Sequence, residues 1–319
     1  MGESKDKVLI TGGLGYLGRR LAKHLRREGW PVVQFTRHSI EASADDGGVL
    51  KFNGDWAVEG PALLKGVRQI IHLACPDEKQ AAADPVGTTQ SAFSFTHGLM
   101  QAATRADVQQ VILASTIHVY GKAMQGHVCE DTIPRPVHPY GIIKRLLEDQ
   151  VSAACSSGKM TATILRLSNG FGVPADPDTT RWSLIINDLC RQAVEKNRLE
   201  LKSDPRVLRN FVTLQDVCLA MQHCLLHPAG QEGRLMNIGS RRACSLGEMA
   251  EMVQERCLAV LGRRVDLYAP VKQDSPIPTL DYDIRRMQAS GIELMEDFTA
   301  EIDLTLAACA RWFVPESAA

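Results

Sequence analysis

The pattern of apolar and polar positions predicts alternating strands and helices in the first half of the chain. Val8 to Ile10 end in a glycine-dense turn, and the apolar residues from Tyr16 to about Arg27 recur at helical spacing. Further apolar runs predict strands at 31–35, 50–53, 69–74, 110–115 and 162–167, and helices near 63–64, 86–105, 183–196, 216–226, 245–261 and 302–313. This alternation predicts an α/β fold with a doubly wound parallel sheet.

Composition narrows the class of protein. The chain has 319 residues and a formal net charge of −1, which argues against nucleic acid or an anionic membrane as the main partner. Nine cysteines without C-x-x-C spacing indicate reduced thiols in place of a disulfide framework or a metal site. The sequence shows no signal peptide or membrane span, so we expect a soluble, cytoplasmic protein.

The turn after the first strand has the spacing Gly12-x-x-Gly15-x-x-Gly18. Glycines let a pyrophosphate approach the main chain, and the N–H groups at the start of the following helix favour an anion. By itself such a turn is as compatible with binding nothing as with binding a dinucleotide.

Candidate chemistry follows the fifth strand. Thr116 ends that strand, and Tyr140 and Lys144 stand four residues apart in a predicted helix, which places the phenol and the ammonium on one helical face. The Lys charge favours the phenolate, so Tyr140 can act as an acid or base, and the Thr116 hydroxyl can polarise the same substrate oxygen.

The chain resembles the extended short-chain dehydrogenase/reductases, the branch that holds nucleotide-sugar epimerases, dehydratases and ketoreductases. The resemblance runs from residue 7 to about 313. Its motifs are Thr11-Gly-Gly-Leu-Gly-Tyr-Leu-Gly18, Gly54-Asp55, His72-Leu73-Ala74, Ala114-Ser-Thr-Ile-His-Val-Tyr-Gly121, Tyr140-x-x-x-Lys144, Leu165-Arg-Leu-Ser-Asn-Gly-Phe-Gly172, Arg209-Asn-Phe-Val-Thr-Leu-Gln-Asp216 and Asn237-Ile-Gly239.

The resemblance implies roles for individual residues. Tyr140, Lys144 and Thr116 would be catalytic, and Asn169 and Arg209 would hold the substrate diphosphate. Cofactor-binding residues would be Thr11, Gly12, Gly15, Tyr16, Leu17, Gly18, Thr36, Arg37, Asp55, Trp56, Leu73, Ala74, Cys75, Ser115, Tyr140 and Lys144. It also implies a homodimer formed through the helices at 86–105 and 140–155, and no metal.

Departures from the family pattern refine the expectation. Thr36-Arg37-His38 stands where NAD-using members carry an acidic residue, so Arg37 favours NADP, with NAD as the alternative. Ile117-His118 replaces the Asp-Glu pair of the dehydratases, which argues against a 4,6-dehydration reaction. His118 matches in offset a catalytic cysteine of the epimerase-reductases, so it is a candidate acid/base or substrate contact, or else a structural histidine.

We therefore expect an NAD(P)-binding Rossmann domain from residues 1–168 and about 209–233. A smaller, discontinuous substrate-binding domain would span about 169–208 and 234–319. The expected reaction is hydride transfer at C4 of a nucleotide-activated sugar, with a 4-ketoreductase slightly favoured over a 4-epimerase because of the NADP preference. A non-catalytic NAD(P)-binding sensor or subunit is the third alternative.

Overall fold

The computed structural model describes residues 5–36, 49–121, 125–270, 276 and 278–313. The chain divides into two compact units. The first comprises residues 1–123, 130–167 and 220–236, and the second 124–129, 168–219 and 237–319. This division places residues 209–219 in the second unit, whereas the sequence-based boundaries placed them in the first.

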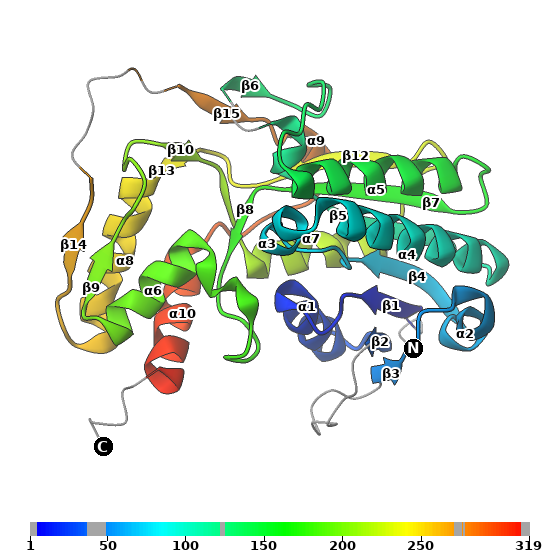
Figure 1. The fold of residues 1–319 in the computed structure, drawn as a ribbon, viewed down its shortest axis with the longest axis horizontal. Coiled ribbons are helices and arrows are strands. Elements are labelled where there is room, and N and C mark those ends of the chain that lie inside the picture. Colours follow the sequence, from blue (N-terminus) through cyan, green and yellow to red (C-terminus); the bar gives the residue numbers. More distant parts are fainter. Residues whose placement is uncertain (1–4, 37–48, 122–124, 271–275, 277, 314–319) are drawn as a thin grey trace. The chain divides into compact units, whose positions relative to one another are not determined.

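The first unit is built on a parallel sheet (Figure 1). Strand order across the seven-stranded sheet is β12 (Arg234–Ile238), β7 (Thr161–Leu167), β5 (Gln110–Thr116), β4 (Val67–His72), β1 (Lys7–Thr11), β2 (Val32–Thr36) and β3 (Val49–Lys51). Each pairing from β7 through to β3 is parallel. Every residue of β5 is buried, as expected of a strand covered on both faces. The predicted α/β doubly wound fold is confirmed.

Helices connect these strands. They are α1 (Tyr16–Arg27), α2 (Trp56–Leu63), α3 (Glu78–Ala83), α4 (Pro85–Arg105), α5 (Pro139–Cys155) and α7 (Leu214–Leu226), of which residues 220–226 belong to this unit, with a 3-10 turn, η1 (Ile117–Tyr120). α4 and α5 lie side by side (Figure 1), and Gln150 of α5 donates a hydrogen bond to the Phe93 carbonyl of α4. His24 of α1 is hydrogen-bonded to Gln222 of α7.

The short helix α3 was absent from the sequence-based prediction. Asp77 and Gln80 form a capping box at its start, and Asp84 caps the next helix by accepting a hydrogen bond from Gly87 N–H. Pro85 occupies the first position of α4, where its missing N–H is tolerated. The predicted helix at 86–105 corresponds to α4, and the six residues of α3 are too few to show a helical period.

The second unit combines small two-stranded sheets with a helical core. The pairs are β8 (Asn169–Phe171) with β11 (Phe211–Thr213), β10 (Leu208–Arg209) with β13 (Cys244–Ser245), β9 (Arg198–Glu200) with β14 (Asp266–Tyr268), and β6 (Gly126–Val128) with β15 (Leu280–Tyr282). The helices are η2 (Thr180–Ser183), α6 (Ile185–Glu195), α8 (Leu246–Leu261), α9 (Arg285–Ala289) and α10 (Phe298–Trp312). Apolar side chains of α6, α8 and α10 form one core. Ser245 and Glu248 form a capping box at the start of α8, each side chain bonding the other residue's backbone N–H.

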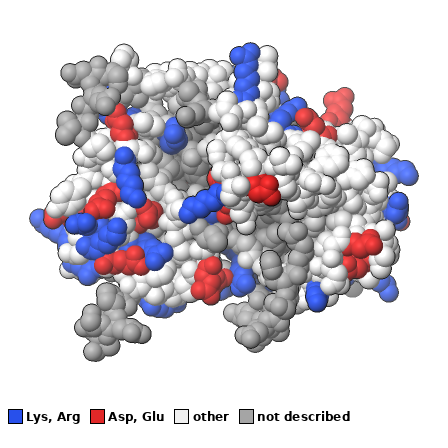
Figure 2. Space-filling model, viewed as in Figure 1, with Lys and Arg blue, Asp and Glu red and all other residues white. Residues whose placement is uncertain are grey.

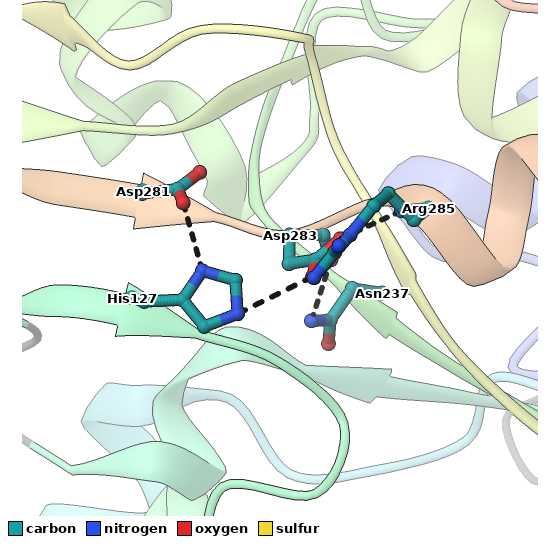
Figure 3. Close-up of polar contacts among 5 residues, drawn as sticks. All are labelled: His127, Asn237, Asp281, Asp283 and Arg285. Carbon is teal, nitrogen blue, oxygen red and sulfur yellow. Dashed lines mark hydrogen bonds and ion pairs between the residues drawn. The ribbon is translucent and has the colours of Figure 1, made fainter.

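A polar network joins β6 to β15 in this unit. Figure 3 shows the His127 ring between two carboxylates, with Nδ1 2.8 Å from Asp281 and Nε2 3.3 Å from Asp283. Arg285 donates to both oxygens of Asp283, and the Asn237 amide donates to the Asp283 carbonyl. The hydrogen bonds and charge of Arg285 lower the pKa of the Asp283 carboxyl, so this carboxylate stays ionised.

Acidic and basic side chains are interspersed on the face drawn in Figure 2. Among the described residues, no helix combines the length and apolar character that a bilayer crossing requires. Nor do three or more His, Cys, Asp or Glu side chains of that part of the chain gather as metal ligands would.

Candidate active site

The glycine turn between β1 and α1 is closely packed against its own backbone and against the end of β4. Gly12 has a φ of +65°, and a Cβ there would lie 2.9 Å from the backbone nitrogen of Ala74. A Cβ on Gly18 would lie 2.3 Å from the Gly12 carbonyl oxygen. Both positions therefore require glycine on steric grounds.

The same turn presents the N-terminus of α1. Gly15 is the N-cap and has no side chain with which to bond the first N–H groups, and no acidic residue occupies the first turn. Tyr16 and Leu17, the first residues of the helix, are half-buried. Uncapped N–H groups at a helix N-terminus fit a pyrophosphate, so the turn fits the dinucleotide that the motif predicts.

Thr11 connects the turn to the end of β4 by hydrogen bonds. Its Oγ1 accepts hydrogen bonds from the backbone N–H groups of Leu73 and Ala74, both at 3.2 Å, and lies 2.6 Å from His72 Nδ1. Because that oxygen already accepts twice, its own hydrogen is directed to Nδ1. The His72 proton then resides on Nε2, which lies 2.9 Å from Thr96 Oγ1.

His72 is wholly buried and remains neutral. Burial, with a smaller contribution from the Lys144 charge, lowers the pKa of His72 from 6.5 to about 3. In the sequence, His72 stood out only as part of the motif His72-Leu73-Ala74, without a role of its own. Its position shows that it supports the glycine turn from within the core.

The structure brings the four catalytic candidates together at the end of β5. Thr116 Oγ1 accepts a 3.3 Å hydrogen bond from the His118 backbone N–H. The His118 and Tyr140 rings meet edge to face, with 6.2 Å between their centres. Lys144 Nζ lies 5.8 Å from the centre of the Tyr140 ring and donates a 2.6 Å hydrogen bond to the Ala114 carbonyl.

Local sequence explains how α5 presents its functional face. His138 is the N-cap, with Nδ1 accepting a hydrogen bond from Tyr140 N–H, and Pro139 begins the helix. A Cβ on Gly141 would lie 2.9 Å from the His118 carbonyl oxygen, so glycine permits this close approach of α5 to η1. His118 itself is an exposed residue.

The remaining cofactor candidates differ in what their side chains do. Asp55 is the N-cap of α2 and accepts hydrogen bonds from two of its N–H groups. The Trp56 ring packs in the core against Phe52, with 4.5 Å between ring centres, so only its backbone is suited to contact a cofactor. The Ser115 hydroxyl donates a hydrogen bond to Glu148, so for Ser115 too the backbone is the part suited to contact a cofactor. Cys75 is half-buried just after β4.

The position proposed to discriminate NADP from NAD lies outside the described residues. Thr36 ends β2 and is buried, whereas Arg37 and His38 belong to the undescribed segment. The hypothesis that Arg37 contacts a 2′-phosphate therefore stays a prediction.

The two substrate candidates lie in the second unit. The Asn169 amide donates a 2.8 Å hydrogen bond to the carbonyl of Asn210, the residue after Arg209. Arg209 is half-buried, and burial lowers the pKa of its guanidinium. Its Nη1 donates to the Leu208 carbonyl at 3.3 Å. A desolvated guanidinium suits a phosphate partner.

Two charged residues near the catalytic candidates were not identified from sequence. Glu148 and Arg166 form an ion pair of 2.7 Å, and the two side chains are 2% and 1% exposed. The available signals were an arginine within an apolar strand and a glutamate four residues after Lys144. Neither signal indicates that the two residues interact, because they are 18 positions apart on different elements.

Comparison with known proteins identifies the family. Residues 8–239 match the model of the NAD dependent epimerase/dehydratase family. The chain is 26% identical over 272 residues to a UDP-glucose 4-epimerase of Azospirillum brasilense, which covers 79% of this chain and 78% of that protein. It is also 26% identical over 309 residues to a putative UDP-arabinose 4-epimerase of Arabidopsis thaliana, covering 85% of this chain and 70% of that protein.

Solved structures agree in fold. MoeE5, solved in complex with UDP-glucuronic acid and NAD, superposes with a TM-score of 0.76 at 26% identity, covering 96% of this chain and 99% of that one. A UDP-N-acetylglucosamine 4-epimerase from Methanobrevibacter ruminantium has a TM-score of 0.80 at 18% identity, covering 96% and 98%. This chain belongs to the NAD-dependent epimerase/dehydratase family of extended short-chain dehydrogenase/reductases.

Proposed function

We propose that the protein is a nucleotide-sugar 4-epimerase that uses NAD. The observation that carries this proposal is the convergence of Thr116, Tyr140 and Lys144 at the end of β5, next to a glycine turn that fits a dinucleotide. NAD, when bound, supplies reversible hydride transfer. The sequence alone favoured a 4-ketoreductase, but the two relatives compared by sequence above are named as 4-epimerases, which supports the alternative.

The residues of this chain handle the proton and the sugar. The Tyr140 phenolate takes the proton of the sugar C4 hydroxyl as that carbon is oxidised, and returns it after the sugar has presented its other face. Thr116 orients the reacting oxygen by a hydrogen bond, and the Lys144 ammonium stabilises the phenolate. The Arg209 guanidinium holds the substrate diphosphate, and the Asn169 amide supports that region.

The test is incubation with NAD and a panel of UDP- and dTDP-linked hexoses, followed by NMR of the anomeric protons and by absorbance at 340 nm. We expect interconversion of C4 epimers without net NADH. Tyr140→Phe should abolish conversion, and Tyr268→Phe, at an exposed tyrosine of the second unit, should leave it intact. Stoichiometric consumption of NADPH with a 4-keto sugar would establish the ketoreductase instead. Cofactor binding without either reaction would favour the sensor.

Cofactor choice has its own test. The family uses NAD, and the sequence carries no acidic residue at Thr36-Arg37-His38, which supports tolerance of a 2′-phosphate. Titration with NAD and NADP, for the native protein and Arg37→Ala, compares the two. If Arg37 binds the phosphate, the variant loses affinity for NADP far more than for NAD. Equal losses would refute that role.

We also propose a homodimer formed through α4 and α5. Val86, Phe93 and Ile142 are 78%, 43% and 48% exposed on these adjacent helices, an apolar surface that a second copy would bury. Sedimentation equilibrium would report a dimer, and a monomer at all concentrations would contradict the proposal.

A further inference from the structure

The Glu148 carboxylate, one helical turn beyond Lys144 on α5, accepts four hydrogen bonds. It accepts from Ser115 Oγ at 2.5 Å, from Arg166 Nε at 2.9 Å and Nη2 at 2.7 Å, and from Arg145 Nη1 at 3.1 Å. Both of its oxygens are bonded, and the side chain is 2% exposed. Charge-assisted bonds of this number fix the carboxylate in position and orientation.

Arg166 connects the same carboxylate to two further segments. It stands opposite Ser115 in the ladder between β7 and β5. Its guanidinium lies over the Tyr120 ring, 4.7 Å from the ring centre, and donates to the Glu130 carbonyl at 3.4 Å. Burial alone would lower the pKa of this guanidinium, but the hydrogen bonds and charge of Glu148 outweigh burial and raise it. Arg166 therefore stays charged although it is buried.

The elements joined by this network are the two that carry the catalytic candidates. Thr116 follows Ser115 directly and is the N-cap of η1, which ends at Tyr120. Glu148 lies one helical turn beyond Lys144 on α5, the helix that also carries Tyr140. The ion pair therefore contacts Ser115 just before η1 and Tyr120 at its end, and Glu148 lies one turn from Lys144 on α5.

We propose that the buried Glu148–Arg166 pair is a positioning device that sets the spacing between the Thr116 hydroxyl and the Tyr140–Lys144 face of α5. This inference rests on the proposed function, since it assigns positioning residues to the reaction proposed above. A buried ion pair contributes little net stability relative to a well-packed apolar pair, whereas its bonds are directional. The pair therefore contributes mainly to the geometry of the site. Misplacement of catalytic groups by about 1 Å can lower turnover about 100-fold.

Arg166→Lys tests the device with little change of charge. Lysine cannot form two parallel bonds to a carboxylate or lie flat on Tyr120. We expect kcat to fall by about 10- to 100-fold, with KM and NAD affinity nearly unchanged. Ser115→Ala leaves the ion pair in place and should lower kcat less. Arg256→Lys is the matched control, because Arg256 forms a similar two-bond pair with Asp303 in the second unit; its kcat should stay native.

A second readout does not depend on the substrate. Tyrosine is labelled by 13C at Cζ, and the Tyr140 signal is assigned from Tyr140→Phe. The pH at which that signal titrates is sensitive to the position of the phenol relative to the Lys144 ammonium. We expect this midpoint to move in Arg166→Lys and not in Arg256→Lys. If Arg166→Lys fails to fold, Ser115→Ala decides by the same readouts.

Folded variants with native kcat and an unmoved Tyr140 signal would overturn the positioning role. So would a fall in thermal stability alone, because that is the signature of a structural pair. If the native protein converts no nucleotide sugar yet the Tyr140 signal moves in Arg166→Lys, the proposed function fails while the positioning role stands.

Discussion

The Lys144 ammonium lies 5.8 Å from the centre of the Tyr140 ring, one helical turn along α5. Its hydrogen bond to the Ala114 carbonyl holds it there against β5. The ammonium is therefore fixed by the sheet while the phenol is fixed by the helix. The distance between the Lys144 ammonium and the Tyr140 ring is therefore set by the fold and does not vary with the lysine rotamer.

Replacing Lys144 by Met should lower turnover and move the pH optimum upward. Without the ammonium, the Tyr140 phenolate forms only at higher pH, so kcat near neutrality should fall by about 100-fold or more and partly recover as the pH is raised. The measurement is kcat against pH for the epimerisation. Lys7→Met serves as control, since Lys7 also donates to a backbone carbonyl, that of Lys65. An unchanged pH profile would exclude the electrostatic role of Lys144.

Much of the first unit could be predicted from sequence, because its strands are continuous apolar runs and its helices have a clear period. The strand predicted at 110–115 is β5, and the helix predicted at 86–105 is α4 to within one residue. Two- and three-residue strands such as β10 and β13 carry no period at all. They exist because distant segments pair, which no local pattern encodes.

The candidate site divides in the same way. Tyr140 and Lys144 share one helix, so their spacing alone indicated a common face. Glu148 and Arg166 interact across two elements, and His72 bonds to Thr11 and Thr96 on two others. Such contacts follow from sheet order, and sheet order could not be read from the sequence of any one segment.

Gly12→Ala should reduce NAD affinity more than its backbone strain alone explains. Gly12 and Gly29 both have positive φ, +65° and +77°, so alanine is strained by about 1–2 kcal/mol at either position. Only at Gly12 would the new Cβ also meet the Ala74 backbone, since nothing lies within 4 Å at Gly29. Urea unfolding and NAD titration should show Gly29→Ala mildly destabilised with native affinity, and Gly12→Ala impaired in both. Matching results for the two variants would contradict the close-approach argument.

His72 should make the protein less stable as the pH falls from about 6.5 toward about 3. In that window the unfolded chain protonates this histidine while the folded chain keeps it neutral, so unfolding takes up a proton. The free energy of unfolding should therefore decrease by up to about 1.4 kcal/mol for each pH unit. Above pH 6.5 His72 is neutral in both states and contributes no slope.

Urea unfolding of the native protein and of His72→Asn, at pH values from 8 to 4, isolates this contribution. The two proteins should show parallel stability between pH 8 and 7 and diverge in slope below 6.5, with the variant less sensitive to acid. The assignment fails if both lose stability equally down to pH 4.

Thiol reactivity should separate the nine cysteines into two groups. Seven are buried, and burial raises the pKa of several of these thiols, for example to about 11 for Cys155 and about 12 for Cys224. Such thiols stay protonated at pH 8 and inaccessible, so they should react with a disulfide reagent only on unfolding. Cys75 and Cys129 are half-buried and should react first.

Saturating NAD should then slow one of these two reactions. Cys75 follows Ala74, whose backbone meets the glycine turn, so a bound dinucleotide would shield Cys75 while Cys129, in the second unit, stays reactive. The measurement is the number of fast-reacting thiols per chain with and without NAD, with Cys75→Ser and Cys129→Ser to assign each phase. We expect two fast thiols without NAD and one with it, the remaining one absent from Cys129→Ser. Protection of neither thiol would place the cofactor away from the end of β4 and remove the main structural support for the glycine turn as its site.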